Sequence, residues 1–598
     1  MNSFYVINLT IYAAVDAMAC LGLSQQFGVA GVTNFGYIIF QSAGAYAAAI
    51  LSLPPDTANG GFQSYIGGWQ LPFPLPWIGA AVAGGVVALP FTFLVGRRLR
   101  GDFAAVGLLV TAVLLNLLAT NYRPALNGDA GLALVPAPLK GATGQFTTQP
   151  ASYQWAFTAV AIALCAAVFV LLRRVTESPY GRSLRAMRDN DAVAESLGKN
   201  LLSLRTAMLV IGGAIAGLSG GVLVSYISTW SPAAWGYAET VVLFAAVIIG
   251  GSGNHVGALL GAILVPVGFE EVTRYIPTSN NLPPNLIPSL EWVAIGLLIV
   301  VFLWLWPRGI LPERKRVIPL SGPVPGGEPA TAPTALARAG SPRGRESGII
   351  LEARGLSCEF GGVRAVAEVS FAVRRGTLTG LIGPNGAGKS TLLAMLAGTL
   401  QATAGRVIYQ GRDITGVAAF CRARMGLVRT FQLASEFRRL TVMENLLSAV
   451  PDNRGDSLQG ALRGRRYWRA DEQRARARAE AILDRFGMSG YASQYAGDLS
   501  GGQRRLVEIM RALMAGPAML LLDEPMAGVH PNLARQIGNE LVALCQEGMT
   551  VLMVEHELAI MDEFCDPVVV MADGSVLAEG TMRELRGRSE VLEAYLVG

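Results

Sequence analysis

The first 310 residues of this 598-residue chain carry a series of apolar runs, each close to the length that crosses a lipid bilayer. A spanning helix needs about 20 mostly apolar residues, within a range of roughly 17–25. The short runs on either side of "GGSGNHVG" (Gly250–Gly257) are alternatively half-spans or a re-entrant pair, which only surrounding protein makes tolerable. We predict an α-helical polytopic membrane domain of about nine spans: 5–22, 36–53, 77–95, 104–121, 154–172, 206–229, 238–252, 256–272 and 289–306.

The rest of the chain has a different composition. Charged residues make up 15% of the whole chain, against about 25% in typical soluble domains, but residues 350–598 have an ordinary soluble composition. A stretch rich in Pro, Gly and Ala joins the two parts and is typical of a flexible linker. We therefore predict a membrane domain (1–316), a linker (317–349) and a soluble domain (350–598). The mild net charge of +5 gives no reason to expect a nucleic-acid partner.

Basic residues predict how the membrane domain is oriented. Lys and Arg in its sequence fall almost entirely within 97–100, 173–205 and 308–316. The segments that must face the other side contain only Arg123, Lys140 and Arg274. Basic loops stay in the cytoplasm. With nine spans, the N-terminus is then predicted to lie outside the cell and the soluble domain in the cytoplasm, at a bacterial inner membrane. The N-terminal apolar run lacks a basic start and a cleavage site, so we interpret it as a first span.

The basic segment Ser178–Asn200 interrupts two apolar runs and is predicted to be helical. Ser178 can cap a helix whose first residue is a proline, and Gly198 can end it in a left-handed conformation. Asn190 and Asp191 are placed to divide it into two helices. Its apolar face consists of Leu184, Met187, Ala194 and Leu197. This amphipathic element either rests on anionic lipid or docks against another domain.

The segment "GPNGAGKST" fits the phosphate-binding pattern G-x-x-x-x-G-K-[ST] in full. It follows an apolar strand-like run and opens a helix-like one, which is the context that the pattern requires. Backbone N–H groups of such a loop converge on phosphate oxygens. Lys389 is predicted to reach the β- and γ-phosphates of ATP, and the Ser390 hydroxyl to bind Mg²⁺. The predicted nucleotide contacts are Gly383, Pro384, Asn385, Gly386, Ala387, Gly388, Lys389, Ser390 and Thr391.

A second motif, "AMLLLDEP" (Ala518–Pro525), is predicted to be a buried strand that ends in two carboxylates. Asp523 is placed to bind Mg²⁺, through a water molecule. Glu524 beside it is the candidate general base that polarises the attacking water. An apolar run before Asp-Glu is common, but its position downstream of a phosphate-binding loop favours this interpretation.

The third motif, "LSGGQRRLVEIMRALM" (Leu499–Met514), places two glycines before a predicted helix. The N-terminus of such a helix can bind phosphate. A nucleotide already held by the phosphate-binding loop does not need this second site. We therefore expect Ser500, Gly501, Gly502 and Gln503 to face the nucleotide that another copy of the domain holds.

Together these three motifs resemble the signature of ATP-binding-cassette (ABC) ATPases over the whole of 350–598. In that family two cassettes enclose two ATP molecules head to tail. The resemblance implies that Gln432 in "RTFQ" senses Mg²⁺ and contacts the membrane domain. It also implies that His556 contacts the γ-phosphate and that Phe360 lies under adenine. The chain departs from the family at His530, where most cassettes have Asp in the loop that crosses the dimer.

The membrane domain resembles the permeases of branched-chain amino-acid uptake systems. The resemblance rests on the segment Ser178–Asn200, on "YAAVDAMACLGLSQQFGVAGVTNFG" near the N-terminus and on Glu239–Ala262. The C-terminal tail resembles the matching ATPase subunits. The chain thus resembles a permease fused to its ATPase, which implies ATP-driven uptake of branched-chain or related amino acids. Relatives that handle urea, short amides or aromatic acids leave the substrate open.

The resemblance also implies partners: a second permease and cassette, a periplasmic solute-binding protein, and membrane lipid. A non-identical second permease and cassette is favoured over a homodimer. Two other functions remain open at this stage. One is an ABC exporter or flippase, and the other is a membrane-tethered regulatory ATPase that translocates nothing.

Overall fold

The computed structural model describes residues 3–55, 63–96, 101–139, 150–268, 286–313, 318, 348–430 and 436–596. The chain forms two compact units. Met1–Arg188 and Leu202–Arg314 make up the first, and Asp189–Leu201 and Lys315–Gly598 make up the second. The predicted linker lies almost entirely outside the described residues.

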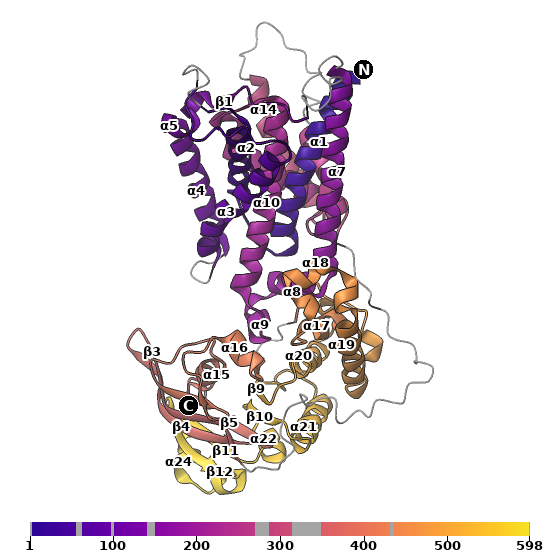
Figure 1. The fold of residues 1–598 in the computed structure, drawn as a ribbon. Helices are drawn as coiled ribbons and strands as arrows, with labels where there is room; N and C mark the ends of the chain where they lie inside the picture. The colour runs from indigo at the N-terminus through magenta and orange to yellow at the C-terminus, as the bar shows by residue number, and fades with distance from the viewer. Residues whose placement is uncertain are drawn as a thin grey trace. The chain divides into compact units, whose positions relative to one another are not determined.

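The first unit is built of helices (Figure 1). Its first helix, α1, continues without a break as a π-helix, η1. A two-stranded pair of β1 (Leu132–Ala133) and β2 (Thr229–Trp230) joins two of its loops. The helices are α1 (Ser3–Leu23), η1 (Ser24–Val29), α2 (Ile38–Ser52), α3 (Leu75–Val95), α4 (Gly101–Asn121), α5 (Arg123–Leu126), η3 (Gly128–Ala130), α7 (Pro150–Glu177), α8 (Pro179–Asp189), α10 (Leu201–Ile227), η4 (Pro232–Trp235), α11 (Tyr237–Gly250), α12 (His255–Ala262), η5 (Ile263–Val267) and α14 (Leu286–Leu305).

Every predicted span overlaps a helix within the described residues, although the end of 256–272 lies outside them. Two of them, 36–53 and 256–272, correspond to the shorter apolar helices Ile38–Ser52 and His255–Pro266. The predicted span 289–306 coincides with α14, an apolar helix of 20 residues. Among the described residues, six helices are long and apolar enough to cross a membrane: Phe4–Val29, Leu75–Val95, Gly101–Asn121, Ser152–Glu177, Leu201–Ile227 and Pro232–Gly250. The helical membrane domain is therefore confirmed, while a total of nine spans stays a prediction.

Glycines let three of these helices touch backbone to backbone. A Cβ added to Gly44 of α2 would lie 2.1 Å from the carbonyl oxygen of Gly217 in α10. One added to Gly84 of α3 would lie 2.2 Å from the carbonyl oxygen of Gly213. Lipid provides no hydrophobic driving force for helix association, so the helices associate through close van der Waals packing, which small residues allow. Helices α1 and α7 also lie side by side (Figure 1).

The local structure predicted for Ser178–Asn200 is confirmed. The Ser178 hydroxyl accepts a hydrogen bond from the backbone N–H of Gly181 at the start of α8. Asn190 is extended and caps a second helix, α9 (Asp191–Ser196), by accepting from the N–H of Val193. Gly198 follows with a left-handed φ of +86°. The segment is therefore two short helices that meet at Asn190.

The second unit contains two sheets. The strand order in the larger sheet is β12-β11-β5-β10-β9-β8, in which β12 alone runs antiparallel to its neighbour. The smaller sheet is antiparallel, in the order β4-β3-β6-β7. The strands are β3 (Ile349–Phe360), β4 (Val363–Arg374), β5 (Leu378–Ile382), β6 (Ala404–Tyr409), β7 (Arg412–Asp413), β8 (Leu427–Arg429), β9 (Met519–Asp523), β10 (Thr550–Val554), β11 (Val568–Ala572) and β12 (Ser575–Gly580).

Helices cover the sheets and form a further helical part of this unit (Figure 1). They are α15 (Lys389–Ala397), α16 (Ala419–Arg424), α17 (Val442–Ser448), η6 (Arg454–Asp456), α18 (Leu458–Arg463), α19 (Arg465–Arg485), η7 (Ser489–Tyr491), η8 (Ala496–Asp498), α20 (Gly501–Met514), α21 (Pro531–Gln546), α22 (Leu558–Phe564), α23 (Met582–Arg586) and α24 (Ser589–Leu596). The predicted α/β architecture is confirmed.

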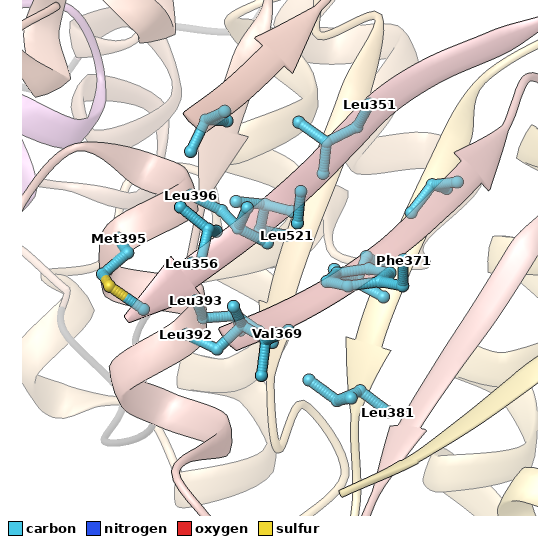
Figure 2. Close-up of a cluster of buried hydrophobic side chains, with 14 of the residues drawn as sticks. Leu351, Leu356, Val369, Phe371, Leu381, Leu392, Leu393, Met395, Leu396 and Leu521 are labelled. Atoms are coloured by element: carbon cyan, nitrogen blue, oxygen red, sulfur yellow. The ribbon is translucent and has the colours of Figure 1, made fainter. Parts of the chain in front are cut away.

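The main core of this unit fixes α15 between the two sheets. Figure 2 shows Leu392, Leu393, Met395 and Leu396 of α15 among side chains of β3 and β4 and of β5 and β9. All four are at most 1% exposed. Burying one such side chain stabilises the fold by about 1.5–3 kcal/mol. The core thus holds the start of α15, and with it the end of the preceding loop, in a fixed place.

Candidate active site

Three adjacent parallel strands bring the predicted catalytic segments to one edge of the larger sheet. Strand β10 lies between β5 and β9, and its last residue, Val554, is paired with both Leu381 and Asp523. All three strands are buried along their whole length. The phosphate-binding loop follows β5, Glu524 follows β9 and His556 follows β10. In parallel sheets, ligands bind at this carboxyl edge.

The loop Gly383–Gly388 contains left-handed backbone conformations at two of its glycines. Gly386 and Gly388 have φ values of +84° and +88°, which side-chain-bearing residues rarely adopt. Lys389, the first residue of α15, is 6% exposed and reaches back over the loop. Its Nζ donates to the carbonyl oxygens of Gly383 (2.7 Å) and Pro384 (2.9 Å). The lysine therefore points to the concave side of the loop, where phosphate oxygens would lie.

Burial lowers the pKa of Lys389 from its ordinary value, while the carboxylates of Glu524 and Asp523 act in the opposite direction. A buried cation is unfavourable unless anions surround it. The two carboxylates meet part of that need, and phosphate oxygens would meet the rest. The electrostatics at Lys389 therefore favour a strongly anionic ligand.

Asp523 and Ser390 form a pair of oxygen groups at the sheet edge. The Ser390 hydroxyl lies 3.4 Å from one carboxylate oxygen of Asp523, which is 1% exposed. The other carboxylate oxygen accepts from Arg429 Nη2 at 3.0 Å. Arg429 ends β8, and the sequence reasoning overlooked it although it is the first residue of the "RTFQ" motif. Its charge offsets that of a buried carboxylate.

Glu524 and His556 contact each other directly. His556 Nε2 lies 2.7 Å from Glu524 Oε1. Glu524 adopts a left-handed φ of +48°, which is uncommon for a residue with a side chain and is typical of functional sites. Its side chain is 11% exposed and that of His556 is 44% exposed. The predicted base and the predicted switch histidine thus share one corner of the site.

Arg505 holds the backbone of this corner, and the sequence reasoning did not single it out. It comes from α20 and donates to the carbonyl oxygens of Asp523 (3.3 Å), Glu524 and Pro525 (3.1 Å). Its charge is balanced by Glu508 one turn further along, at 2.7 Å. Both side chains are at most 5% exposed. The helix that follows "LSGG" is therefore fastened to the strand end that carries Glu524.

Glu555 is a buried carboxyl that lies next to the site. Burial raises its pKa to about 7, although the backbone N–H groups of Met526 and His556 favour the ionised form. It is 3% exposed, and its Oε1 accepts from the N–H of Met526 at 2.7 Å. It supports the loop after Glu524 and titrates near neutral pH.

Glu555→Gln is expected to stabilise the protein in a pH-dependent way. The ordinary pKa is 4.5 and the folded value is about 7. The stabilisation from the neutral carboxyl is therefore full below about pH 4.5 and is lost as the pH rises through about 7. The amide never ionises, so the variant should gain on the order of 3 kcal/mol over the parent at about pH 8 and little at about pH 5. Thermal unfolding at the two pH values measures this.

The matched control for that measurement is Glu579→Gln, because Glu579 is an exposed carboxylate of the same unit. Its unfolding temperature should equal that of the parent at both pH values. A gain for Glu555→Gln that is equal at both pH values would contradict the role assigned to its titration.

The signature segment forms a capped helix N-terminus, as predicted. Ser500 caps α20: its hydroxyl accepts from the N–H of Gln503, whose side chain accepts from the N–H of Ser500. A Cβ added to Gly502 would meet Leu533 of α21 at 2.9 Å, but one added to Gly501 would meet no atom within 4 Å. Packing within this chain therefore explains the glycine at 502 and does not explain the one at 501.

The remaining predicted positions lie as follows. Phe360 ends β3 with its side chain 52% exposed, as a stacking surface requires. His530 is exposed and caps α21, its Nδ1 accepting from the N–H of Asn532 at 3.3 Å. It thereby performs the capping that an aspartate at this position could also perform. Gln432 lies outside the described residues.

Comparison with known proteins matches both halves of the chain to families. The family model described as "Branched-chain amino acid transport system / permease component" matches residues 5–303, which is half of the chain. The family model described as "ABC transporter" matches residues 366–527.

Similar proteins are found for the second half. The probable branched-chain amino acid transport ATP-binding protein LivG of Archaeoglobus fulgidus is 38% identical over 41% of this chain and 95% of its own length. The protein of the same description from Methanocaldococcus jannaschii is 40% identical over 41% of this chain and 93% of its own length. A solved structure of a nucleotide-free ATP-binding cassette from an ABC transporter is 38% identical, covers 42% of this chain and 99% of that chain, and has a TM-score of 0.37.

A membrane permease and an ATPase in one polypeptide define an ATP-driven transporter. The chain belongs to the branched-chain amino acid transport family of ABC transporters, with a permease domain and an ATP-binding domain fused in one chain. It is a multi-pass membrane protein of the importer class whose second domain hydrolyses ATP to drive transport.

Proposed function

We propose that this chain is the fused permease–ATPase subunit of an importer that takes up branched-chain or related amino acids. The observation that carries the proposal is the presence, in one chain, of a permease-family half and an ATPase half similar to LivG proteins. We propose the domain limits 1–316, 317–349 and 350–598. Urea, short amides and aromatic acids are the alternative substrates.

We propose that the site at the sheet edge binds and hydrolyses ATP. Bound ATP supplies the phosphoanhydride bond that is cleaved. Lys389 and the N–H groups of the loop bind its phosphates, while Phe360 stacks on its base. Glu524 accepts a proton from the attacking water, and His556, 2.7 Å from that carboxylate, holds it in place and contacts the terminal phosphate.

The residues also fit Mg²⁺. This ion prefers oxygen ligands and is commonly held by few protein groups together with phosphates and water. The hydroxyl of Ser390 and the carboxylate of Asp523 supply such oxygens 3.4 Å apart. Gln432 is proposed as a third group. Mg²⁺ would neutralise the charge that develops on the phosphates.

A second cassette completes the site in this proposal. Gly501 has no positive φ, and space for a Cβ is open around it. A glycine that its own chain does not require is expected where another molecule approaches the backbone closely. We therefore propose that Ser500, Gly501, Gly502 and Gln503 contact ATP held by a partner cassette. A second permease and cassette, different from this chain, is favoured over a homodimer.

The segment Asp189–Leu201 supports the proposed coupling between hydrolysis and transport. It belongs to the same compact unit as the cassette. Within that unit, Arg424 Nε of α16 donates to the carbonyl oxygen of Gly198 at 2.8 Å, and the N–H of Arg439 donates to Asp189 at 2.8 Å. Lys199 forms an ion pair with Asp456. A cassette movement would therefore carry this segment along, which favours docking over a lipid-resting helix.

We propose further that the chain lies in a bacterial inner membrane with its N-terminus outside and the cassette in the cytoplasm. The distribution of Lys and Arg supports this orientation. A solute-binding protein on the outer side would deliver the substrate, as the resemblance to uptake systems of this family implies. Lipid surrounds the apolar helices.

Uptake measurements test the proposal. The chain, purified with its associated subunits and binding protein and reconstituted into vesicles, is expected to accumulate radiolabelled leucine when ATP is present on the cassette side. Excess unlabelled isoleucine or valine should compete, while urea, acetamide and benzoate should not. Vesicles of Lys389→Ala protein provide the baseline.

Each alternative predicts a different result. Movement of the labelled solute away from the cassette side would identify an exporter. ATP hydrolysis without any transport would identify a tethered regulatory ATPase. Competition by urea, acetamide or benzoate alone would reassign the substrate.

A further inference from the structure

The end of α7 and the end of α8 are both hydrogen-bonded to the same short segment of the first unit. Just before α8, the hydroxyl of Thr176 donates to Gln25 Oε1 at 3.0 Å. In the last turn of α8, Arg188 Nη1 donates to the carbonyl oxygen of Gly28. Both acceptors belong to η1 (Ser24–Val29), the π-helix that continues α1. The eleven residues of α8 therefore lie between two links to η1, one just before the helix and one in its last turn.

The η1 segment is unusual in both backbone and content. The π-helix is rare in proteins and is frequently found at functional sites. Ser24, Gln25 and Gln26 are three consecutive polar residues with 0% exposure. Buried polar groups in a membrane domain are costly and indicate a function. Gln26 Nε2 donates to the carbonyl oxygen of Leu209 at 3.1 Å, so η1 is also fastened to α10.

Arg188 also contacts a second segment, the chain after α14, through its other terminal nitrogen. Its Nη2 pairs with Glu313 Oε2 at 2.9 Å, and the two side chains are 9% and 26% exposed. Glu313 lies a few residues after α14. A guanidinium can hold a carbonyl and a carboxylate at once through separate nitrogens, whereas a lysine ammonium is a single point charge. Arg188 therefore joins α8, η1 and the chain after α14.

Close backbone approach makes this junction tight. A Cβ on Gly31 would lie 2.7 Å from Cγ of Arg188, and one on Gly28 would lie 2.2 Å from the N of Gly253 in the α11–α12 corner. The same corner begins α12 with His255, whose Nε2 lies 2.9 Å from the Thr176 hydroxyl. Thr176 thus contacts both η1 and the α11–α12 corner, and Arg188 contacts η1.

We propose that Thr176 and Arg188 are positioning residues for transport: they make α8 and η1 move as one body. A displacement of α8 then changes the access of water to Ser24, Gln25 and Gln26. This inference rests on the proposed function, because ATP-driven movement of the cassette has to displace α8. The two links act on η1 and not on the site that hydrolyses ATP.

A cysteine placed at residue 24 reports on η1. Ser24→Cys is introduced into the full chain, within its native complex in membranes, and its reaction with a small charged methanethiosulfonate reagent is timed with and without ATP. The parent complex without this substitution gives the background of the six native cysteines. The rate is expected to differ several-fold between the two states.

Arg188→Ala and, separately, Thr176→Val are then added to the reporter. Each is expected to abolish the ATP-dependent difference while the rate of ATP hydrolysis stays within about twofold of the parent, because neither residue belongs to the unit that carries the hydrolytic site. Arg188→Lys keeps the charge opposite Glu313 but loses the second link, so it should also abolish the difference. The matched control is Arg205→Ala, since Arg205 donates to the carbonyl oxygen of Val95 in α3 at 3.2 Å. This control should behave like the parent.

The outcomes separate this inference from the proposed function. A difference that persists in Arg188→Ala or Thr176→Val, that Arg188→Lys restores in full, or that Arg205→Ala also removes would overturn the positioning role. No difference in the reporter itself while ATP is hydrolysed would overturn it too. No ATP hydrolysis by the parent complex would instead refute the proposed function on which the inference rests.

Discussion

Lys389→Ala should reduce ATP hydrolysis by the assembled transporter by at least about 100-fold, the loss seen when one preorganised donor to a developing charge is removed. The Nζ of Lys389 is held over the loop by the carbonyl oxygens of Gly383 and Pro384. A water molecule in its place would lack the positive charge. Phosphate release at saturating ATP and Mg²⁺ measures the loss.

Two controls accompany that variant. Lys389→Arg keeps the charge, but the larger group cannot enter a space in which the lysine is 6% exposed, so activity should also be lost. Arg364→Ala removes an exposed cation from β4 and should leave the rate unchanged. Substantial hydrolysis by Lys389→Ala would mean that the phosphates bind elsewhere.

Glu524→Gln should reduce hydrolysis by about 10²–10⁴-fold, the usual contribution of a general base, while ATP binding persists. The amide has nearly the shape of the carboxylate but cannot accept the proton of the attacking water. Uptake of the labelled amino acid should fall with hydrolysis. Rapid filtration with labelled ATP measures binding, and phosphate release measures turnover.

Glu555→Gln provides the comparison, because it is the same substitution at the residue between β10 and His556 and leaves the Glu524–His556 contact in place. It should retain most of the activity. Trapped ATP together with undiminished uptake in Glu524→Gln would mean that hydrolysis does not drive translocation.

The sequence predicted the parts of the site that depend on local structure. "GPNGAGKST", "AMLLLDEP" and the run before His556 each consist of a buried parallel strand followed by its functional residue, and such strands are near-continuous apolar runs. Once these strands are neighbours, their carboxyl ends must meet. The capping of α8 by Ser178 and of α9 by Asn190 was predictable for the same reason, since each depends on residues three positions apart.

The residues that sequence reasoning missed act over long distances in the chain. Arg429 reaches Asp523 across 94 positions, and Arg188 reaches Gly28 across 160. An arginine has no periodicity or spacing that reveals its partner. The number of spans was difficult for another reason: α12 has only eight residues and depends on tight packing against α11, so apolarity alone cannot show whether it crosses the membrane.

The way in which Arg505 supports Glu524 has a consequence for how such sites evolve. Arg505 donates to the backbone carbonyl oxygens of Asp523, Glu524 and Pro525. The strand end therefore keeps its shape whatever side chain stands at 524, provided that the residue tolerates a left-handed backbone, as Asn, Asp and Gly do. Loss of the carboxylate is thus a change of chemistry without a change of fold. In an assembly of two non-identical cassettes, one site can lose hydrolysis and remain an intact ATP-dependent clamp while the other retains turnover.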